Sequence, residues 1–132
     1  MHPLDYIRPF HDDEVQEALQ KGAHHPMLKA LLGFALPDKS PDEISQILAA
    51  CHSIREFQIN IIYPAVLRIL EKSSEGLTSS GFENLTPGCP YLFISNHRDI
   101  VLDTSLLNTV LYENNLLMTA SAIGDNLVHK PF

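Results

Sequence analysis

One short polar segment holds the residues best suited to chemistry. It reads Ser95-Asn96-His97-Arg98-Asp99-Ile100-Val101-Leu102-Asp103 and directly follows an apolar run. A neutral imidazole can act as a general base because its ordinary pKa is about 6.5, and a carboxylate on its other nitrogen fixes the tautomer and stabilises the cation. His97 is therefore the candidate base, with Asp103 or, as the second choice, Asp99 as its partner.

The same residues have a purely structural interpretation. Aspartate is among the preferred residues at the start of a helix, so Asp99 is also expected to cap a helix that follows it. His97 is then a hydrogen-bonded turn residue. A histidine and two aspartates within seven residues favour this structural interpretation when nothing else is considered.

The elements on either side of the segment must position it. Residues 91–94 form a short apolar run typical of a strand, and residues 102–111 are predicted to form a helix. Further strands are predicted at 77–82 and 116–122. Strand, helix and strand in this order predict an α/β unit with a parallel crossover, in which polar residues after a strand lie at the carboxyl edge of the sheet.

The region before this unit, residues 1–75, is predicted to be helical, and residues 76–132 to begin the α/β domain. Helices are predicted from about 12 to 22 with Asp12 as cap, from Pro26 to before Pro37, from 41 to 50, and from 53 to 72. The third begins with Ser40-Pro41-Asp42-Glu43, a capping box. The fourth contains Pro64, which removes a backbone donor, so we expect a kink or a break there.

Composition limits the function. The formal net charge of −7, from 16 acidic and 9 basic residues, argues against nucleic acid as a partner, because phosphate contacts need a basic surface. Cys51 and Cys89 lack metal-type spacing and are predicted to be free, buried thiols in a reducing compartment, which favours the cytoplasm. The first residues lack the pattern of a signal peptide, and apolar runs are shorter than the roughly 18–20 residues of a spanning helix. Any membrane association is expected to be peripheral, on the inner face.

Three ordered matches resemble the glycerol-3-phosphate and 1-acylglycerol-3-phosphate acyltransferase superfamily. Residues 91–98 followed by Asp103 are similar to its first signature block, in which an apolar strand leads into Asn-His and an aspartate follows shortly after. Residues 81–88 are similar to the Gly-x-Glu-Asn-Leu segment before that block, and residues 127–132 to the Leu-x-x-x-Pro-Phe stretch after it. Residues 1–75 resemble the helical leader of bacterial putative glycerol acyltransferases. The resemblance implies a helical leader followed by the first strand-helix-strand unit of a truncated α/β acyltransferase domain.

The resemblance also implies a mechanism. His97 would take the proton from a glycerol hydroxyl as the hydroxyl attacks the thioester of acyl-CoA or acyl-carrier protein, and the motif aspartate would orient the imidazole. It implies no covalent enzyme intermediate, no metal and no cofactor beyond the acyl thioester. Asn96 and Arg98 would bind substrate, Arg98 by placing positive charge near a phosphate or pantetheine group. A surface salt bridge is the alternative role of Arg98.

The spacing departs from the family pattern. Four residues usually separate the histidine from the aspartate, whereas Leu102 occupies that position here and Asp103 follows one residue later. One residue on a helix is a rotation of about 100°, so Asp103 reaches His97 only if the intervening turn is looser than usual. Asp103 is the favoured partner, and Asp99 competes with it.

The family's later blocks, which supply a phosphate-binding arginine and a Glu-Gly-x-Arg element, have no counterpart in these 132 residues. We therefore expect the chain alone to be inactive, and the complete protein to acylate a glycerol-phosphate-type acceptor or lysophospholipid in phospholipid synthesis. The alternatives are a non-catalytic helical interaction module and an acyltransferase with another lipid acceptor. An incomplete sheet would expose an unpaired edge, so self-association is also expected.

Overall fold

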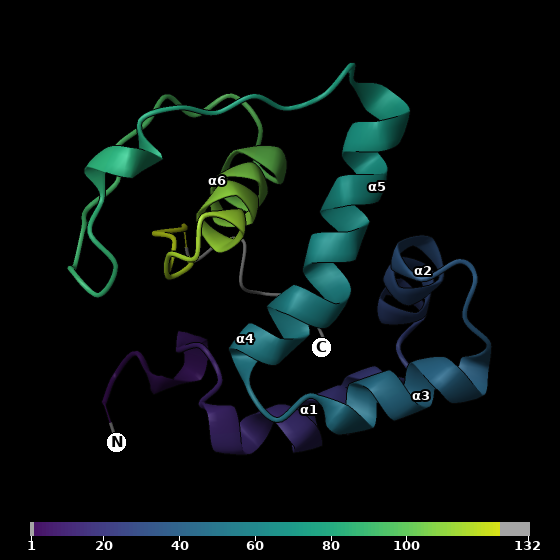
Figure 1. Ribbon diagram of the computed structural model, residues 1–132. Coiled ribbons are helices and arrows are strands. Elements are labelled where there is room, and N and C mark those ends of the chain that lie inside the picture. Colours follow the sequence, from purple (N-terminus) through teal and green to yellow (C-terminus); the bar gives the residue numbers. More distant parts are fainter. Residues whose placement is uncertain (1, 125–132) are drawn as a thin grey trace. The chain divides into compact units, whose positions relative to one another are not determined.

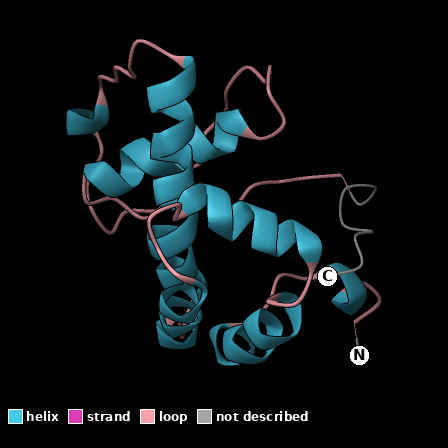
Figure 2. Cartoon of the chain, turned by 90° about the vertical axis from the view of Figure 1, so that its right-hand side faces the viewer, coloured by secondary structure: helices cyan, strands magenta, loops and turns pink. Residues whose placement is uncertain are grey.

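The computed structural model describes residues 2–124, and the regular elements of that range are helices (Figures 1 and 2). The chain forms two compact units. The described part of the first contains residues 2–65 and 122–124, and the second contains residues 66–121. The predicted boundary between residues 75 and 76 stays a prediction. Within residues 2–124, no helix combines the length and the apolar character needed to cross a membrane.

The first unit consists of short helices that follow one another closely. They are η1 (Asp5–Ile7), η2 (Asp12–Glu14), α1 (Val15–Gly22), α2 (Pro26–Ala35), α3 (Pro41–Ala50), α4 (Ile54–Phe57), the π-helical turn η3 (Gln58–Ile62) and the first residues of α5 (Tyr63–Ser73). Each helix predicted from the sequence in this region is present to within a few residues.

Local hydrogen bonds explain where two of these helices begin. Ser40 Oγ accepts the Glu43 N–H at 3.2 Å and Glu43 Oε2 accepts the Ser40 N–H at 2.8 Å, which confirms the predicted capping box of α3. The predicted capping role of Asp12 is wrong, because His11 precedes η2. Asp12 Oδ1 instead accepts the Ile54 N–H at 2.9 Å, at the start of α4.

The core of the first unit joins α2, α3 and the π-helical turn. Leu32, Leu48 and Ile61 are buried together at its centre. The partly buried apolar residues around them are Leu19, Ala23, Leu28, Leu31, Leu36, Ile44, Ile47 and Phe57. The Gln16 side chain donates to the carbonyl oxygens of Leu48 and Cys51, at the end of α3, where helical carbonyls lack intrahelical partners.

The two cysteines differ in exposure. Both are free thiols, but only Cys51 is buried, while Cys89 is exposed. The prediction that both are buried is therefore wrong for Cys89, because this residue lies in an irregular segment and not in a packed strand.

Pro64 does not break its helix. The helical run continues from α4 through η3 into α5, and the N–H of Tyr63 donates to the carbonyl of Gln58, five residues earlier. Because Pro64 has no N–H to donate to the preceding turn, a widened π-helical turn just before it absorbs the irregularity.

The second unit contains the rest of α5, the 3-10 turn η4 (Phe82–Asn84) and α6 (Leu102–Glu113), which matches the predicted helix. α6 ends in a Schellman motif: Asn115 is left-handed, with φ 57°, and donates to Tyr112 O at 3.0 Å, while the Leu116 N–H donates to Leu111 O at 2.9 Å. Leu111 and Leu116 are both buried. This motif turns the chain back along α6.

The predicted α/β fold class is wrong, since residues 2–124 contain no β-strand (Figure 2). The strand predicted at 77–82 is interrupted by Gly81, whose φ of 89° starts η4. At 91–94 no neighbouring strand of the described chain supplies the hydrogen-bonded ladder that a strand requires, and Leu92 and Ile94 are 86% and 88% exposed. The strand-helix-strand unit implied by the resemblance is therefore absent from residues 2–124.

The third predicted strand, 116–122, lies along a helix and not in a sheet. The Thr119 N–H donates to Asn108 Oδ1 at 2.7 Å, and Asn108 Nδ2 donates to the Thr119 carbonyl at 3.4 Å. The side-chain amide of Asn108 thus forms hydrogen bonds with both the N–H and the carbonyl of Thr119, the two backbone groups that a neighbouring strand would otherwise pair with. Strand-like sequence is used here to pack an irregular segment against α6.

Candidate functional site

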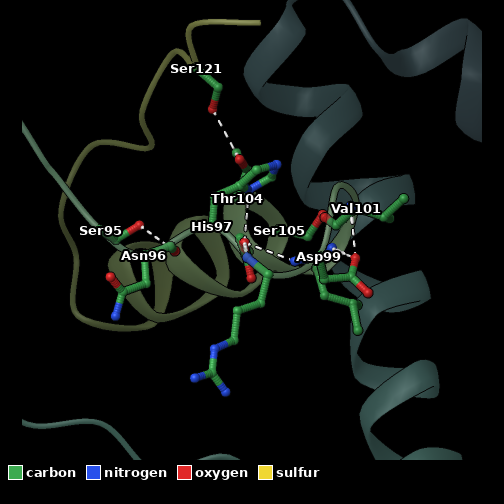
Figure 3. Close-up of polar contacts among 11 residues, drawn as sticks. Ser95, Asn96, His97, Asp99, Val101, Thr104, Ser105 and Ser121 are labelled. Atoms are coloured by element: carbon green, nitrogen blue, oxygen red, sulfur yellow. Dashed lines mark hydrogen bonds and ion pairs between the residues drawn. The ribbon is translucent and has the colours of Figure 1, made fainter. Parts of the chain in front are cut away.

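The carboxylate of Asp103, in the first turn of α6, is the centre of the candidate site. Its Oδ2 atom accepts the backbone N–H of Arg98 at 2.7 Å and that of Asp99 at 3.0 Å, and lies 2.9 Å from Nδ1 of His97. All three contacts converge on one oxygen atom. Figure 3 shows this loop folded around the start of the helix.

Asp99 has a different task. Its Oδ1 atom accepts the N–H of Val101 at 2.8 Å and of Leu102 at 2.7 Å (Figure 3). Val101 immediately precedes α6 and Leu102 is its first residue, so Asp99 caps the turn that leads into the helix and bonds an N–H group that a helix start leaves without a partner. Ser105 Oγ donates to the Val101 carbonyl at 2.6 Å and closes the same turn from the helix side.

The charge of Asp103 determines which ring nitrogen of His97 carries the proton. The N–H groups of Asp99 and Arg98, followed by the side chain of His97, lower the pKa of Asp103 below its ordinary value. The carboxylate is therefore ionised at neutral pH and can only accept hydrogen bonds, so Nδ1 of His97 carries the proton in this contact. In the neutral imidazole, Nε2 then holds the free lone pair.

Exposure leaves the His97 side chain accessible from solvent. The His97 side chain is 72% exposed, whereas that of Asp103 is 27% exposed. A mostly covered carboxylate thus contacts Nδ1 of a mostly exposed imidazole. This arrangement can accept a proton from a hydroxyl group at Nε2 while Asp103 stabilises the resulting cation.

The structure separates the two aspartates that compete in the sequence. Asp103 contacts His97, whereas the Asp99 side chain caps the turn that leads into α6. Arg98 contributes its backbone N–H to Asp103. Asn96 lies on the preceding loop, where its carbonyl accepts Ser95 Oγ at 3.2 Å. The substrate-binding roles of Asn96 and Arg98 stay predictions.

The sequence analysis did not identify the polar face of α6 that forms hydrogen bonds with Thr119 and Ser121, in the segment after the helix. Besides the Asn108 contacts, Ser121 Oγ donates to Thr104 Oγ1 at 3.2 Å, directly beside Asp103 in the sequence (Figure 3). The available signal was Asn108 four residues after Thr104, since this spacing places both on one face of a predicted helix.

One histidine of the first unit has a structural role. His25, one of two adjacent histidines, accepts the Met27 N–H through Nδ1 at 3.2 Å and caps α2. In the described range, no group of three or more His, Cys, Asp or Glu side chains is arranged to hold a metal ion. The similarity at 127–132 lies outside the described residues. Comparisons of the chain with protein-family models, with curated proteins and with solved structures found no match.

Proposed function

We propose that this chain carries the general base of an acyltransferase, with His97 as the base and Asp103 as the residue that orients it. The contact between His97 Nδ1 and Asp103 Oδ2, 2.9 Å long, is the observation that carries the proposal. Its support is the coincidence of two independent features. The segment resembles an acyltransferase signature block, and its histidine and later aspartate meet despite the extra residue between them.

The proposed reaction uses the imidazole twice. Nε2 of His97 takes the proton from an acceptor hydroxyl as its oxygen attacks the carbonyl carbon of an acyl thioester. The tetrahedral intermediate then expels the thiolate, which receives the proton from His97 and leaves as a thiol. The new ester bond replaces the thioester bond, and the enzyme returns to its starting protonation state.

The expected substrates follow from the resemblance to the acyltransferase superfamily. An acyl-CoA or acyl-carrier protein donates the acyl group, and a glycerol-phosphate-type molecule or lysophospholipid accepts it. Arg98, next to His97 in sequence, supplies positive charge for a phosphate, and Asn96 supplies an amide for hydrogen bonding. The proposed setting is phospholipid synthesis at the inner face of a membrane.

The test measures thiol release from acyl-CoA by the protein encoded in the longest open reading frame containing this sequence, with glycerol-3-phosphate or lysophosphatidate as acceptor. We expect His97→Ala to lower kcat by about 10²- to 10⁴-fold, the usual contribution of a positioned general base. His52→Ala, at an exposed histidine of the other unit, is the matched control and should retain activity. Full activity of His97→Ala would contradict the proposal.

A second candidate function is a non-catalytic helical interaction module. The observation that favours it is the core of the first unit, which is built from helices alone. A folded, complete protein that transfers no acyl group to either acceptor would favour this alternative, or an acyltransferase for another lipid acceptor.

A further inference from the structure

We infer that Asp99 is a positioning residue: by capping the turn that leads into α6, its side chain fixes where the helix begins and so brings Asp103 to His97 across the extra residue in the motif. The importance of this role for turnover rests on the proposed function. The effect of Asp99 on the contact between His97 and Asp103 is structural and does not depend on the proposed function.

The contacts of Asp99 support this inference from both sides of the turn. Its side chain binds the N–H groups of Val101 and Leu102, and its own N–H binds Asp103 Oδ2 at 3.0 Å. Its carbonyl receives the Asp103 N–H at 3.4 Å, a long bond for a helical turn. Asp99 thus holds both the first residues of the helix and the carboxylate that meets His97.

The position of the helix start decides which way Asp103 points. A shift of the start by one residue would turn each side chain of the first turn by about 100°. Asp103 Oδ2 could then no longer meet His97 and the two backbone N–H groups together. Because the family pattern has one residue fewer at this place, the cap of Asp99 accounts for how the longer spacing still yields the contact.

Packing does not hold this turn in place. Ile100 and Val101, the two residues between Asp99 and the helix, are 64% and 60% exposed. The local constraints on the turn are therefore hydrogen bonds: those of Asp99, that of Ser105 to the Val101 carbonyl, and those that Asp103 Oδ2 accepts. Removal of the Asp99 acceptor should release it.

The test reads the tautomer of His97 by nitrogen-15 NMR of the 132-residue chain at pH 8, where an ordinary imidazole is neutral. The parent chain should show the proton on Nδ1. Asp99→Ala should shift the tautomer towards the Nε2–H form that free imidazole prefers in water. Asp99→Asn, which keeps a capping oxygen, should retain the parent tautomer. Ser40→Ala, which removes the cap of α3, is the matched control and should leave His97 unchanged.

Asp99→Gly keeps the test informative if the alanine variant folds poorly, because glycine at a cap costs a helix little while removing the side-chain acceptor. A parent-like tautomer in a folded alanine or glycine variant would overturn the inference. In the complete protein, loss of the cap should lower kcat by about 10-fold or more with little change in KM. A shifted tautomer together with full activity of His97→Ala would refute the proposed function and leave the positioning role standing.

Discussion

Replacement of Asp103 separates its charge from its geometry. Oδ2 alone accepts the contacts from Arg98, Asp99 and His97. In Asp103→Asn, the amide oxygen can occupy the place of Oδ2 and keep all three donors. The two backbone N–H groups oppose a flip of the amide, because a flip would place its NH₂ group against them. The variant should therefore lose the negative charge and keep the orientation of the imidazole.

The expected magnitudes differ between two substitutions. The charge acts on an exposed imidazole in a strongly screened setting, so Asp103→Asn should lower kcat by only about 2- to 10-fold. Asp103→Ala removes the charge and all three contacts, so it should lower kcat by about 10²- to 10⁴-fold, close to the loss of the base itself. The assay is thiol release by the complete protein at saturating substrates, with the His97 tautomer measured in parallel.

Two results would refute this reasoning. A loss in Asp103→Asn as large as in Asp103→Ala, accompanied by a change of the His97 tautomer, would show that the backbone N–H groups do not hold the amide oxygen in place. Nearly full activity of Asp103→Ala would show that the contact with His97 does not matter for turnover.

Two further predictions concern the first unit. Ile61→Ala should lower the free energy of unfolding by about 2–5 kcal/mol, because Ile61 is fully buried and truncation leaves a cavity. Denaturant titration measures this free energy. The control Met27→Ala, at a residue that is 57% exposed, should change the free energy of unfolding by less than about 0.5 kcal/mol. The hydrogen bonds and charge of Arg8 lower the pKa of Glu14 to about 2. Glu14 should therefore add stability at neutral pH that is lost as the pH falls from about 4.5 to about 2, and an acid titration of Glu14→Gln should lack this component. The same acid dependence in both chains would contradict the assignment.

Local signals explain what could be predicted from the sequence. The capping box at Ser40 needs only residues within one helical turn, and the structure reproduces it. The strand predictions failed because a strand depends on a neighbour that is distant in the chain. Residues 91–94 have strand-forming side chains, yet no described segment pairs with them.

The site shows the same division between local and distant determinants. The sequence identified His97 and both aspartates, but it could not assign them, because their roles depend on where α6 begins. That start depends on hydrogen bonds within residues 97–105. The contact between Asn108 and Thr119 was missed for another reason: it requires the chain to reverse at Asn115, and an asparagine is only a weak signal for a left-handed residue.

The local origin of the site also explains how it can exist without a sheet. The contacts that hold His97 and Asp103 in place come from residues 98–105, so the pair needs only the first turn of α6 and the turn that leads into it. The protection of the pair from water is a separate matter, since His97 is 72% exposed. A general base with this exposure can accept a proton, but transfer of an acyl group to a chosen hydroxyl in preference to water requires surfaces that enclose the thioester. The described residues thus supply the orientation of the base, and the proposed function needs a further element that covers it.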